Sequence, residues 1–228
     1  MDKSNSRIWI VIPTYNEEKI IQSVIKEIKK TGYSNIIVVD DGSSDNTRNA
    51  AQKNGVVVLR HRINRGKGAA TKTAIEAVKL LGADIIVTMD GDGQHDPKDI
   101  TRLISPLYKG YDIVLGTRLK NTLGMPWHKI MANKIGNLFT WYFYGLWVTD
   151  SQSGFRAYSK NAVEKINTYA DRYEYDSEVI REIHKYKLKF CEVPIKVRYT
   201  EYSMNKAQKQ NFWNGIKTLY KMVWNIIS

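Results

Sequence analysis

The sequence predicts an α/β fold in which a mostly parallel central sheet is flanked by helices. Short apolar runs, typical of buried parallel strands, alternate with apolar residues at helical spacing along residues 8–115. Strands that alternate with helices pair in parallel through right-handed crossovers. The length of 228 residues suits one large α/β domain, and 43% hydrophobic with 25% charged residues is ordinary for a folded chain.

The first half of the chain supplies the alternation. The expected strands are residues 8–12, 36–39, 56–59 and 85–89. Pro13 ends the first strand, and helical spacing predicts helices over residues 20–28 and 70–81. Ser43 and Ser44 can cap another helix after the second strand. In such open sheets, ligands bind at the carboxyl ends of the strands.

The second half has a different pattern. We expect a strand at 113–115, an aromatic helical segment at 138–147, a helix at 178–187 and a strand around 190–199. A terminal helix follows, with an apolar stripe between Phe212 and Ile227 and with Lys217 and Lys221 on the opposite face. No linker separates the halves, which favours one domain.

The net charge of +12 comes from 35 basic and 23 acidic residues and favours polyanionic partners. The basic residues are scattered and the aromatic residues form no nucleic-acid-reading motif, so we expect no nucleic-acid partner. The single Cys191 excludes an internal disulfide. Its apolar neighbours predict a buried structural thiol rather than a nucleophile.

Two segments predict contact with a membrane surface. No apolar run reaches the ~20 residues that span a bilayer. Residues 138–147 and the terminal stripe instead match the pattern of interfacial amphipathic helices. The alternative for each is a helix packed on its own domain. With no secretory signal at the start, we expect a cytoplasmic protein, peripheral at the cytoplasmic face of a membrane.

The strongest chemical motif is MDGDGQHDP at residues 89–97. Two carboxylates one residue apart, after a buried strand, repel each other unless a cation lies between them. Carboxylate, amide and phosphate oxygens are ligands that Mg²⁺ or Mn²⁺ accepts. We expect Asp92 and Gln94 to hold the metal while a diphosphate completes its coordination, with Asp90 nearer a ribose. The alternative is a solvated turn.

Three further segments predict a nucleotide pocket. Asp41 can accept the N–H of a nucleobase, or the segment can be a turn with a helix cap. Tyr15 can flank the base and Glu17 can accept a ribose hydroxyl, or these residues form a plain strand-to-helix corner. Lys67, in the glycine-rich helix entry at 64–70, can approach phosphate, or this entry binds no ligand.

Together these motifs resemble those of a known family. PTYNE at 13–17, DDGSSD at 40–45, DGDGQHDP at 90–97, GTR at 116–118 and SGFR at 153–156 occur in the order seen in family 2 glycosyltransferases. Within that family, residues 8–206 look most like the dolichyl- and polyprenyl-phosphate sugar synthases. The set is specific as a whole, although no single motif is.

The resemblance implies a GT-A fold, a nucleotide-sugar donor and inversion at the anomeric carbon. It implies a catalytic domain over residues 1–206, with a donor-binding half (8–115) and an acceptor-binding half (116–206), followed by the amphipathic helix at 207–228. The implied nucleotide-sugar residues are Pro13, Tyr15, Glu17, Asp41, Lys67, Asp90 and Asp92. The implied acceptor-phosphate residues are Arg118, Lys129, Ser153 and Lys206. The implied catalytic residues are Asp92, Arg118 and Arg156.

The acceptor decides whether a base is needed. A hydroxyl acceptor must lose a proton, whereas a phosphate monoester with a second pKa of ~6 is already largely dianionic at neutral pH. The resemblance implies that a hexose passes from GDP-mannose or a UDP-sugar to a polyprenyl or dolichyl phosphate, an acceptor that needs no base. The alternatives are transfer to a hydroxyl with Asp150 or Asp176 as base, and a non-catalytic nucleotide-sugar-binding module at a membrane.

Overall fold

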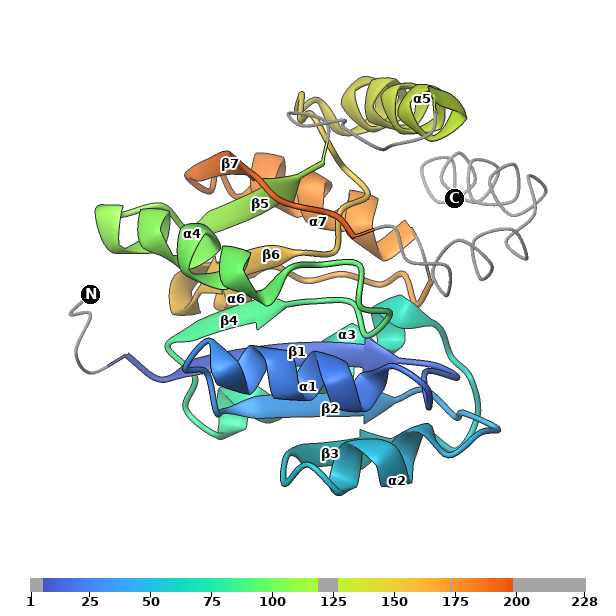
Figure 1. The fold of residues 1–228 in the computed structure, drawn as a ribbon. Coiled ribbons are helices and arrows are strands. Elements are labelled where there is room, and N and C mark those ends of the chain that lie inside the picture. Colours follow the sequence, from blue (N-terminus) through green and yellow to red (C-terminus); the bar gives the residue numbers. More distant parts are fainter. Residues whose placement is uncertain (1–5, 119–126, 173, 199–228) are drawn as a thin grey trace.

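The computed structural model describes residues 6–118, 127–172 and 174–198. Within these residues, seven strands form one sheet in the order β3-β2-β1-β4-β6-β5-β7 (Figure 1). The strands are β1 (Ile8–Thr14), β2 (Ile36–Asp40), β3 (Val57–Arg60), β4 (Ile85–Thr88), β5 (Ile113–Thr117), β6 (Arg156–Ser159) and β7 (Phe190–Pro194). The expected strand positions are correct, with ends that differ by a few residues.

Helices connect the strands. They are α1 (Ile21–Lys30), α2 (Thr47–Gln52), α3 (Lys67–Leu80), α4 (Ile100–Ile104), α5 (Trp127–Tyr144), α6 (Lys160–Lys165) and α7 (Glu174–Lys185), with short 3₁₀ helices η1 (Pro97–Asp99) and η2 (Ser105–Lys109). The helix expected at 178–187 begins four residues earlier. The expected helix at 207–228 lies outside the described residues.

Two apolar layers cover the sheet, because successive side chains of a strand point to opposite faces. Ile10 and Ile12 of β1 belong to the cluster that includes α1, α2 and α4, while Val11 belongs to the cluster on the other face. That second cluster packs α3, α6 and α7 against the sheet (Figure 1). The predicted α/β architecture with helices on both faces is confirmed.

The sheet is parallel except at β6, which runs antiparallel between β4 and β5. We did not predict β6, because Arg156–Ser159 is short and contains no apolar run. β7 ends at Pro194 rather than near residue 199, and proline cannot extend the hydrogen-bonded ladder. Cys191 on β7 is half-buried against the first cluster, so it is less buried than we predicted.

Helix α5 carries a polar side toward the domain and an apolar side toward solvent. Asn137 and Thr140 are buried, and Asn137 binds the backbone of residues 149 and 151. The large exposed apolar side chains here are Met131, Ile135, Leu138, Trp141 and Tyr142 on α5, and Trp147 after it. No helix among the described residues is both long enough and apolar enough to pass through a bilayer.

Candidate active site

Three of the predicted motifs meet at one edge of the sheet. β2, β1 and β4 are parallel neighbours, so the segments that follow them lie side by side at their carboxyl ends. These segments are residues 13–17, 40–45 and 90–97. Gly91 lies directly against β1, because a Cβ there would be 2.6 Å from Thr14 Cγ2. The sheet therefore builds a single site from residues far apart in the sequence.

The first two segments are fastened by side chains to backbone groups. Asn16, with a φ of 54°, receives a bond at Oδ1 from Ser44 N (2.9 Å) and donates its own N–H to Ser43 Oγ (2.9 Å). Glu17 N donates to Thr47 Oγ1 at 2.8 Å. Glu17 is buried, whereas the side chain of Tyr15 is 43% exposed. Tyr15 therefore lies at the surface of the site, where a flat ring could stack on it.

Asp41 is buried and accepts three hydrogen bonds. His61 Nδ1 lies 2.7 Å from Oδ1, Arg65 N donates to Oδ1 at 3.0 Å, and Gly66 N donates to Oδ2 at 2.6 Å. His61 also reaches Thr73 Oγ1 on α3 at 3.0 Å. In this structure Asp41 holds the glycine-rich loop before α3, and a nucleobase N–H would be a fourth donor to its carboxylate.

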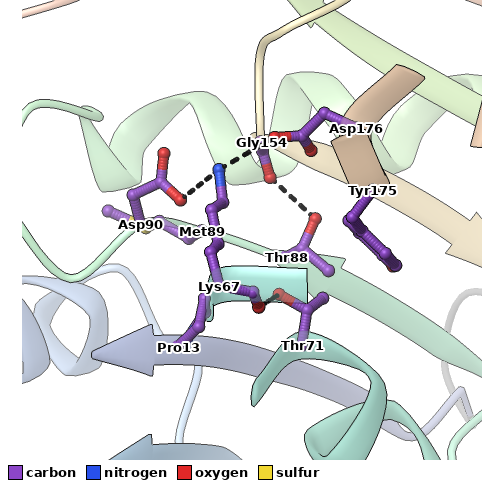
Figure 2. Close-up of a pocket in the computed structure, with 9 residues that line it drawn as sticks. All are labelled: Pro13, Lys67, Thr71, Thr88, Met89, Asp90, Gly154, Tyr175 and Asp176. Carbon is purple, nitrogen blue, oxygen red and sulfur yellow. Dashed lines mark hydrogen bonds and ion pairs between the residues drawn. The ribbon is translucent and has the colours of Figure 1, made fainter. Parts of the chain in front are cut away.

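Lys67, at the start of α3, lies between the turn after β4 and helix α7 (Figure 2). Its Nζ lies 2.8 Å from Asp90 Oδ1 and 3.2 Å from Asp176 Oδ2 on α7. Burial raises the pKa of Asp90, but the Lys67 ammonium, with a smaller contribution from His95, outweighs it and lowers that pKa to about 2. Burial lowers the pKa of Lys67, but the Asp176 and Asp90 charges reverse this and raise it.

A narrow crevice surrounds this lysine. Its lining residues are Pro13, Lys67, Thr71, Thr88, Met89, Asp90, Gly154, Tyr175 and Asp176 (Figure 2). Gly154 leaves the space that Lys67 and Asp90 need, since a Cβ there would lie 3.0 Å from Asp90 Oδ1 and 3.1 Å from Lys67 Cε. Thr88 Oγ1 donates to the Gly154 carbonyl at 2.8 Å, which fixes the glycine against β4.

The turn after β4 fits a divalent metal that a ligand helps to bind. Asp92 Oδ1 accepts the Gln94 N–H at 3.0 Å. Burial raises the pKa of Asp92, and the negative charges of Asp90 and Glu17 raise it further. A cation would relieve this repulsion. Among the described residues, no group of three or more His, Cys, Asp or Glu could hold a metal ion.

His95 links this turn to the β6 side of the site. Its Nδ1 accepts the Asp90 N–H at 3.3 Å, and its ring stacks on Phe155 with a centroid distance of 4.8 Å. Burial lowers the pKa of His95, although the carboxylates of Asp90 and Asp92 oppose that shift. The contact places the turn after β4 directly against the SGFR segment at 153–156.

Arg118 and Asp150 form a close ion pair at the end of β5. Asp150 is buried, and the guanidinium binds both of its oxygens. Ser153 is buried nearby, and its Oγ has no hydrogen-bond partner among the described residues. Lys129 lies in the first turn of α5 by its backbone. Lys206 lies outside the described residues.

Arg156, which we expected to be a catalytic residue, is almost fully buried. It is 1% exposed, and its guanidinium donates to the carbonyls of Ser153 (2.8 Å), Ser151 (2.8 Å) and Asp176 (2.9 Å). It also lies 3.6 Å from Asp176 Oδ1. Arg156 therefore positions the 151–153 loop and α7, and its guanidinium does not face an open site.

Comparison with known proteins identifies the family. The protein-family model described as glycosyl transferase family 2 matches residues 9–167 of this chain. The chain belongs to glycosyl transferase family 2. It is a glycosyltransferase, as the motif set predicted.

Two archaeal relatives match over nearly their whole length. An uncharacterized protein of Methanocaldococcus jannaschii is 46% identical, covering 98% of this chain and 97% of the relative. A UDP-N-acetylglucosamine–dolichyl-phosphate N-acetylglucosaminyltransferase of Methanococcus voltae is 41% identical, covering 95% and 94%. A polyprenol monophosphomannose synthase of Mycolicibacterium smegmatis is 29% identical over 74% of this chain and 67% of its own.

The solved structures confirm the GT-A fold. Glucosyl-3-phosphoglycerate synthase from Mycobacterium tuberculosis, in complex with Mn²⁺, UDP and glucosyl-3-phosphoglycerate, matches with a TM-score of 0.69. The match covers 96% of this chain and 81% of that chain, at 22% sequence identity. At this identity the similarity establishes the fold of this glycosyltransferase and leaves its ligands to other arguments.

Several contacts of the site gave no signal in the sequence. His61 lies outside every predicted motif, yet it supports Asp41. Gly154 belongs to the SGFR motif, but its role in accommodating Lys67 was not predicted. Asp176, a candidate base in the hydroxyl-acceptor alternative, is a shared partner of Lys67 and Arg156, and this pairing was not predicted. These pairings depend on the tertiary fold, because each joins residues at least 20 positions apart.

Proposed function

We propose that this family 2 glycosyltransferase transfers a hexose, with inversion, from a nucleotide-diphosphate sugar to a polyprenyl or dolichyl phosphate. The relative from Methanococcus voltae, 41% identical and matched along its length, supports this acceptor and makes UDP-N-acetylglucosamine the first donor to test. GDP-mannose is the second donor, supported by the more distant polyprenol monophosphomannose synthase. Residues 8–115 would bind the donor and residues 116–206 the acceptor.

The ion pairs of the two candidate bases, Asp150 and Asp176, favour a phosphate acceptor over a hydroxyl acceptor. Both oxygens of Asp150 are bonded by Arg118, each at 2.7 Å. Asp176 is paired with Lys67 and lies 3.6 Å from Arg156. Each carboxylate is engaged by a cationic side chain and would have to leave that ion pair to reach an acceptor hydroxyl. An acceptor that is already anionic needs neither of them as a base.

The donor side is built from residues at the strand ends. Tyr15 would stack on the base, with Asp41, Pro13 and Glu17 forming the floor and ribose side of the pocket. Asp90 would lie near the ribose. Lys67 bridges Asp90 and Asp176 within the crevice, and it can turn its charge toward a diphosphate that enters there.

A divalent metal, Mg²⁺ or Mn²⁺, fits Asp92 and Gln94. When bound there with the donor, it would neutralise the negative charge that develops on the departing nucleoside diphosphate. The protein's own contribution is to hold Asp92 at the end of β4 and to fix Gln94 by the hydrogen bond to Asp92. This contribution is positioning, which lowers the barrier without any covalent intermediate.

On the acceptor side, cationic residues would counter the charge of the lipid phosphate. Arg118, whose guanidinium is fixed by Asp150, is the first candidate for this role. Lys129 and Lys206 are two further candidates. The buried Ser153 hydroxyl would donate a hydrogen bond to the phosphate. Arg156 would act through the 151–153 loop as a positioning residue.

A membrane surface would bring the lipid to the site. The exposed side of α5 carries Leu138, Trp141 and Tyr142, and Trp147 follows it. Aromatic and aliphatic side chains of this kind suit the interface between headgroups and acyl chains, and the net charge of +12 suits anionic lipid. We place the protein at the cytoplasmic face of the membrane, where nucleotide sugars would be available.

A transfer assay tests the proposal. Purified protein with Mn²⁺ or Mg²⁺ is given radiolabelled UDP-N-acetylglucosamine or GDP-mannose and either polyprenyl phosphate, the unphosphorylated polyprenol, or free sugars. We expect label in the lipid fraction with polyprenyl phosphate only, and product of inverted anomeric configuration.

Two results would overturn the proposal. Transfer to free sugars or polyprenol but not to polyprenyl phosphate would establish a hydroxyl acceptor. Donor binding without release of nucleoside diphosphate, with every lipid acceptor tried, would establish a non-catalytic binding module.

A further inference from the structure

The segment that leaves β7 crosses the metal-binding turn. We call residues 194–198 the strap. Its contacts are Pro194 O with Arg102 Nη1 (2.8 Å), Ile195 N with Thr117 O (3.1 Å), Lys196 N with Asp99 Oδ2 (2.6 Å), an antiparallel bridge between Val197 and His95, and Arg198 N with Gln94 O (2.8 Å). Every residue of the strap is therefore tied to the domain, and the last three are tied to the turn and its helix η1.

Arg198 makes the final and most extensive of these contacts. Its Nη1 donates to Glu27 Oε2 on α1 at 2.5 Å, and its Nη2 lies 3.0 Å from Asp96 Oδ1. Asp96 Oδ1 also accepts the Lys98 N–H at the start of η1. One guanidinium thus joins a helix that packs on the sheet, the turn after β4 and the strap from the edge strand β7.

These contacts bear on a predicted metal ligand. The backbone of Gln94 is held on both sides, at its N–H by Asp92 Oδ1 (3.0 Å) and at its carbonyl by Arg198 N (2.8 Å). The direction of the Gln94 side chain depends on that backbone. Glu27 lies on α1, and the buried Ile25 and Ile28 fix this helix against the sheet. Residues that hold a ligand in place commonly change metal affinity by ~10–100-fold when mutated.

We propose that Arg198 is a positioning residue for the divalent-metal site, acting through Gln94 by clamping the strap to Glu27 and Asp96. The inference rests on the proposed function, because Asp92 and Gln94 are metal ligands only in that proposal. An ion pair as exposed as the one between Arg198 and Glu27 contributes little to stability. The clamp matters for the geometry of the turn more than for folding.

The test measures Mn²⁺ affinity directly. Wild type, Arg198→Gln, Arg198→Lys, Glu27→Gln and Asp92→Ala are titrated with Mn²⁺ in saturating UDP and separately in GDP, with free Mn²⁺ followed by electron paramagnetic resonance. Arg181→Gln is the matched control, because Arg181 also pairs with two carboxylates, Glu178 and Glu182, on α7 away from the turn. Metal-free binding of each nucleotide is measured alongside.

We expect Arg198→Gln to raise the apparent Kd for Mn²⁺ by about tenfold, with metal-free nucleotide binding unchanged. Glu27→Gln should raise it by a smaller factor, Arg198→Lys should recover part of the loss, and Arg181→Gln should match wild type. If Arg198→Gln fails to fold, Glu27→Gln carries the test.

The outcomes separate this inference from the function beneath it. If Asp92→Ala loses Mn²⁺ binding but Arg198→Gln and Glu27→Gln bind it as wild type does, the clamp has no positioning role. The clamp also fails if Arg181→Gln weakens Mn²⁺ binding as much as Arg198→Gln does. If Asp92→Ala binds Mn²⁺ normally, or if wild type binds none with either nucleotide, the proposed metal site is wrong and this inference falls with it.

Discussion

Arg118 holds Asp150 through two parallel hydrogen bonds, from Nε to Oδ2 and from Nη2 to Oδ1, each 2.7 Å long. The Arg118 backbone N–H adds a third bond to Oδ2 at 2.9 Å. This fork geometry fixes the plane of the guanidinium as well as its charge. Asp150 is buried and Arg118 is partly exposed, so the pair holds a fixed cation at the end of β5, where we propose that the acceptor phosphate binds.

Replacing Asp150 distinguishes a positioning acid from a catalytic base. We expect Asp150→Asn to raise the KM for polyprenyl phosphate while kcat at saturating lipid falls by less than about tenfold, because Arg118 loses its orientation and no proton transfer is lost. Steady-state kinetics over a range of lipid concentrations measures both. A fall in kcat of about 10³-fold with an unchanged KM would identify Asp150 as a base.

Replacing Asp92 separates metal binding from folding. We expect Asp92→Asn to lower turnover by on the order of 10²–10³-fold, since the charge on the leaving group is no longer countered. The pKa of Asp92 is raised in the folded protein, so its ionised form opposes folding near neutral pH. The unliganded variant should therefore be at least as stable as wild type in thermal unfolding, and nucleotide with Mn²⁺ should no longer raise its Tm.

Two helical glycines should respond in opposite ways to alanine. A Cβ on Gly68 would lie 2.7 Å from Tyr175 Cβ and 2.8 Å from the Ala170 carbonyl, so Gly68→Ala should lower the free energy of unfolding by about 1–3 kcal/mol. Among the described residues, a Cβ on Gly136 would meet only the end of the exposed Gln152 side chain within 3 Å. Gly136→Ala should be neutral or stabilising by up to about 1 kcal/mol. Denaturant unfolding measures both free energies, and equal decreases in the two variants would contradict the prediction.

Asp45 should make the loop beside Glu17 sensitive to acid. Burial raises its pKa, but hydrogen bonds from the Thr47 hydroxyl and from the Glu18 and Thr47 N–H groups outweigh it and lower that pKa. A lowered folded pKa contributes stability that is present above the unfolded value of about 4 and is lost as pH falls below it.

Asp45→Asn should therefore cost about 1 kcal/mol at pH 7 and progressively less below pH 4. Urea unfolding of both proteins between pH 7 and pH 3 checks this trend. A difference that stays constant over the whole range would show that the Asp45 charge does not matter.

The exposed side of α5 should govern vesicle binding. Leu138→Glu and Tyr142→Glu should reduce co-sedimentation with anionic phospholipid vesicles and raise the KM for lipid acceptor, because they place charge on the apolar face. Leu80→Glu is the matched control, since Leu80 is an exposed leucine at the end of α3. Equal loss of vesicle binding in the control, or no loss in the α5 variants, would count against this face.

The sequence predicted most of the strands that position the site. β1, β2 and β4 are continuous apolar runs that are followed by acidic or glycine-rich turns. This local pattern is enough to place the turns together at the carboxyl ends of parallel strands. β6 escaped prediction because its burial comes from its neighbours β4 and β5, and Arg156–Ser159 has no apolar run of its own.

For the site residues, the sequence predicted positions along the strands but not tertiary partners. The motif residues Tyr15, Glu17, Asp90 and Asp92 do lie together at the strand ends, as their positions after strands predicted. The partners of Arg156 and Lys67 could not be predicted. Arg156 stood in a motif that suggested a site cation, but the fold buries it among backbone carbonyls of the 151–153 loop.

The sequence by itself determined the fold class, the family and the edge of the sheet where the motifs gather, because these follow from periodicity and from residues adjacent in the chain. The tertiary structure alone decided which charges pair. Lys67 with Asp176, Arg118 with Asp150 and Arg198 with Glu27 join residues 109, 32 and 171 positions apart. Electrostatic and hydrogen-bond energies depend on distance in space, and no local pattern encodes that distance.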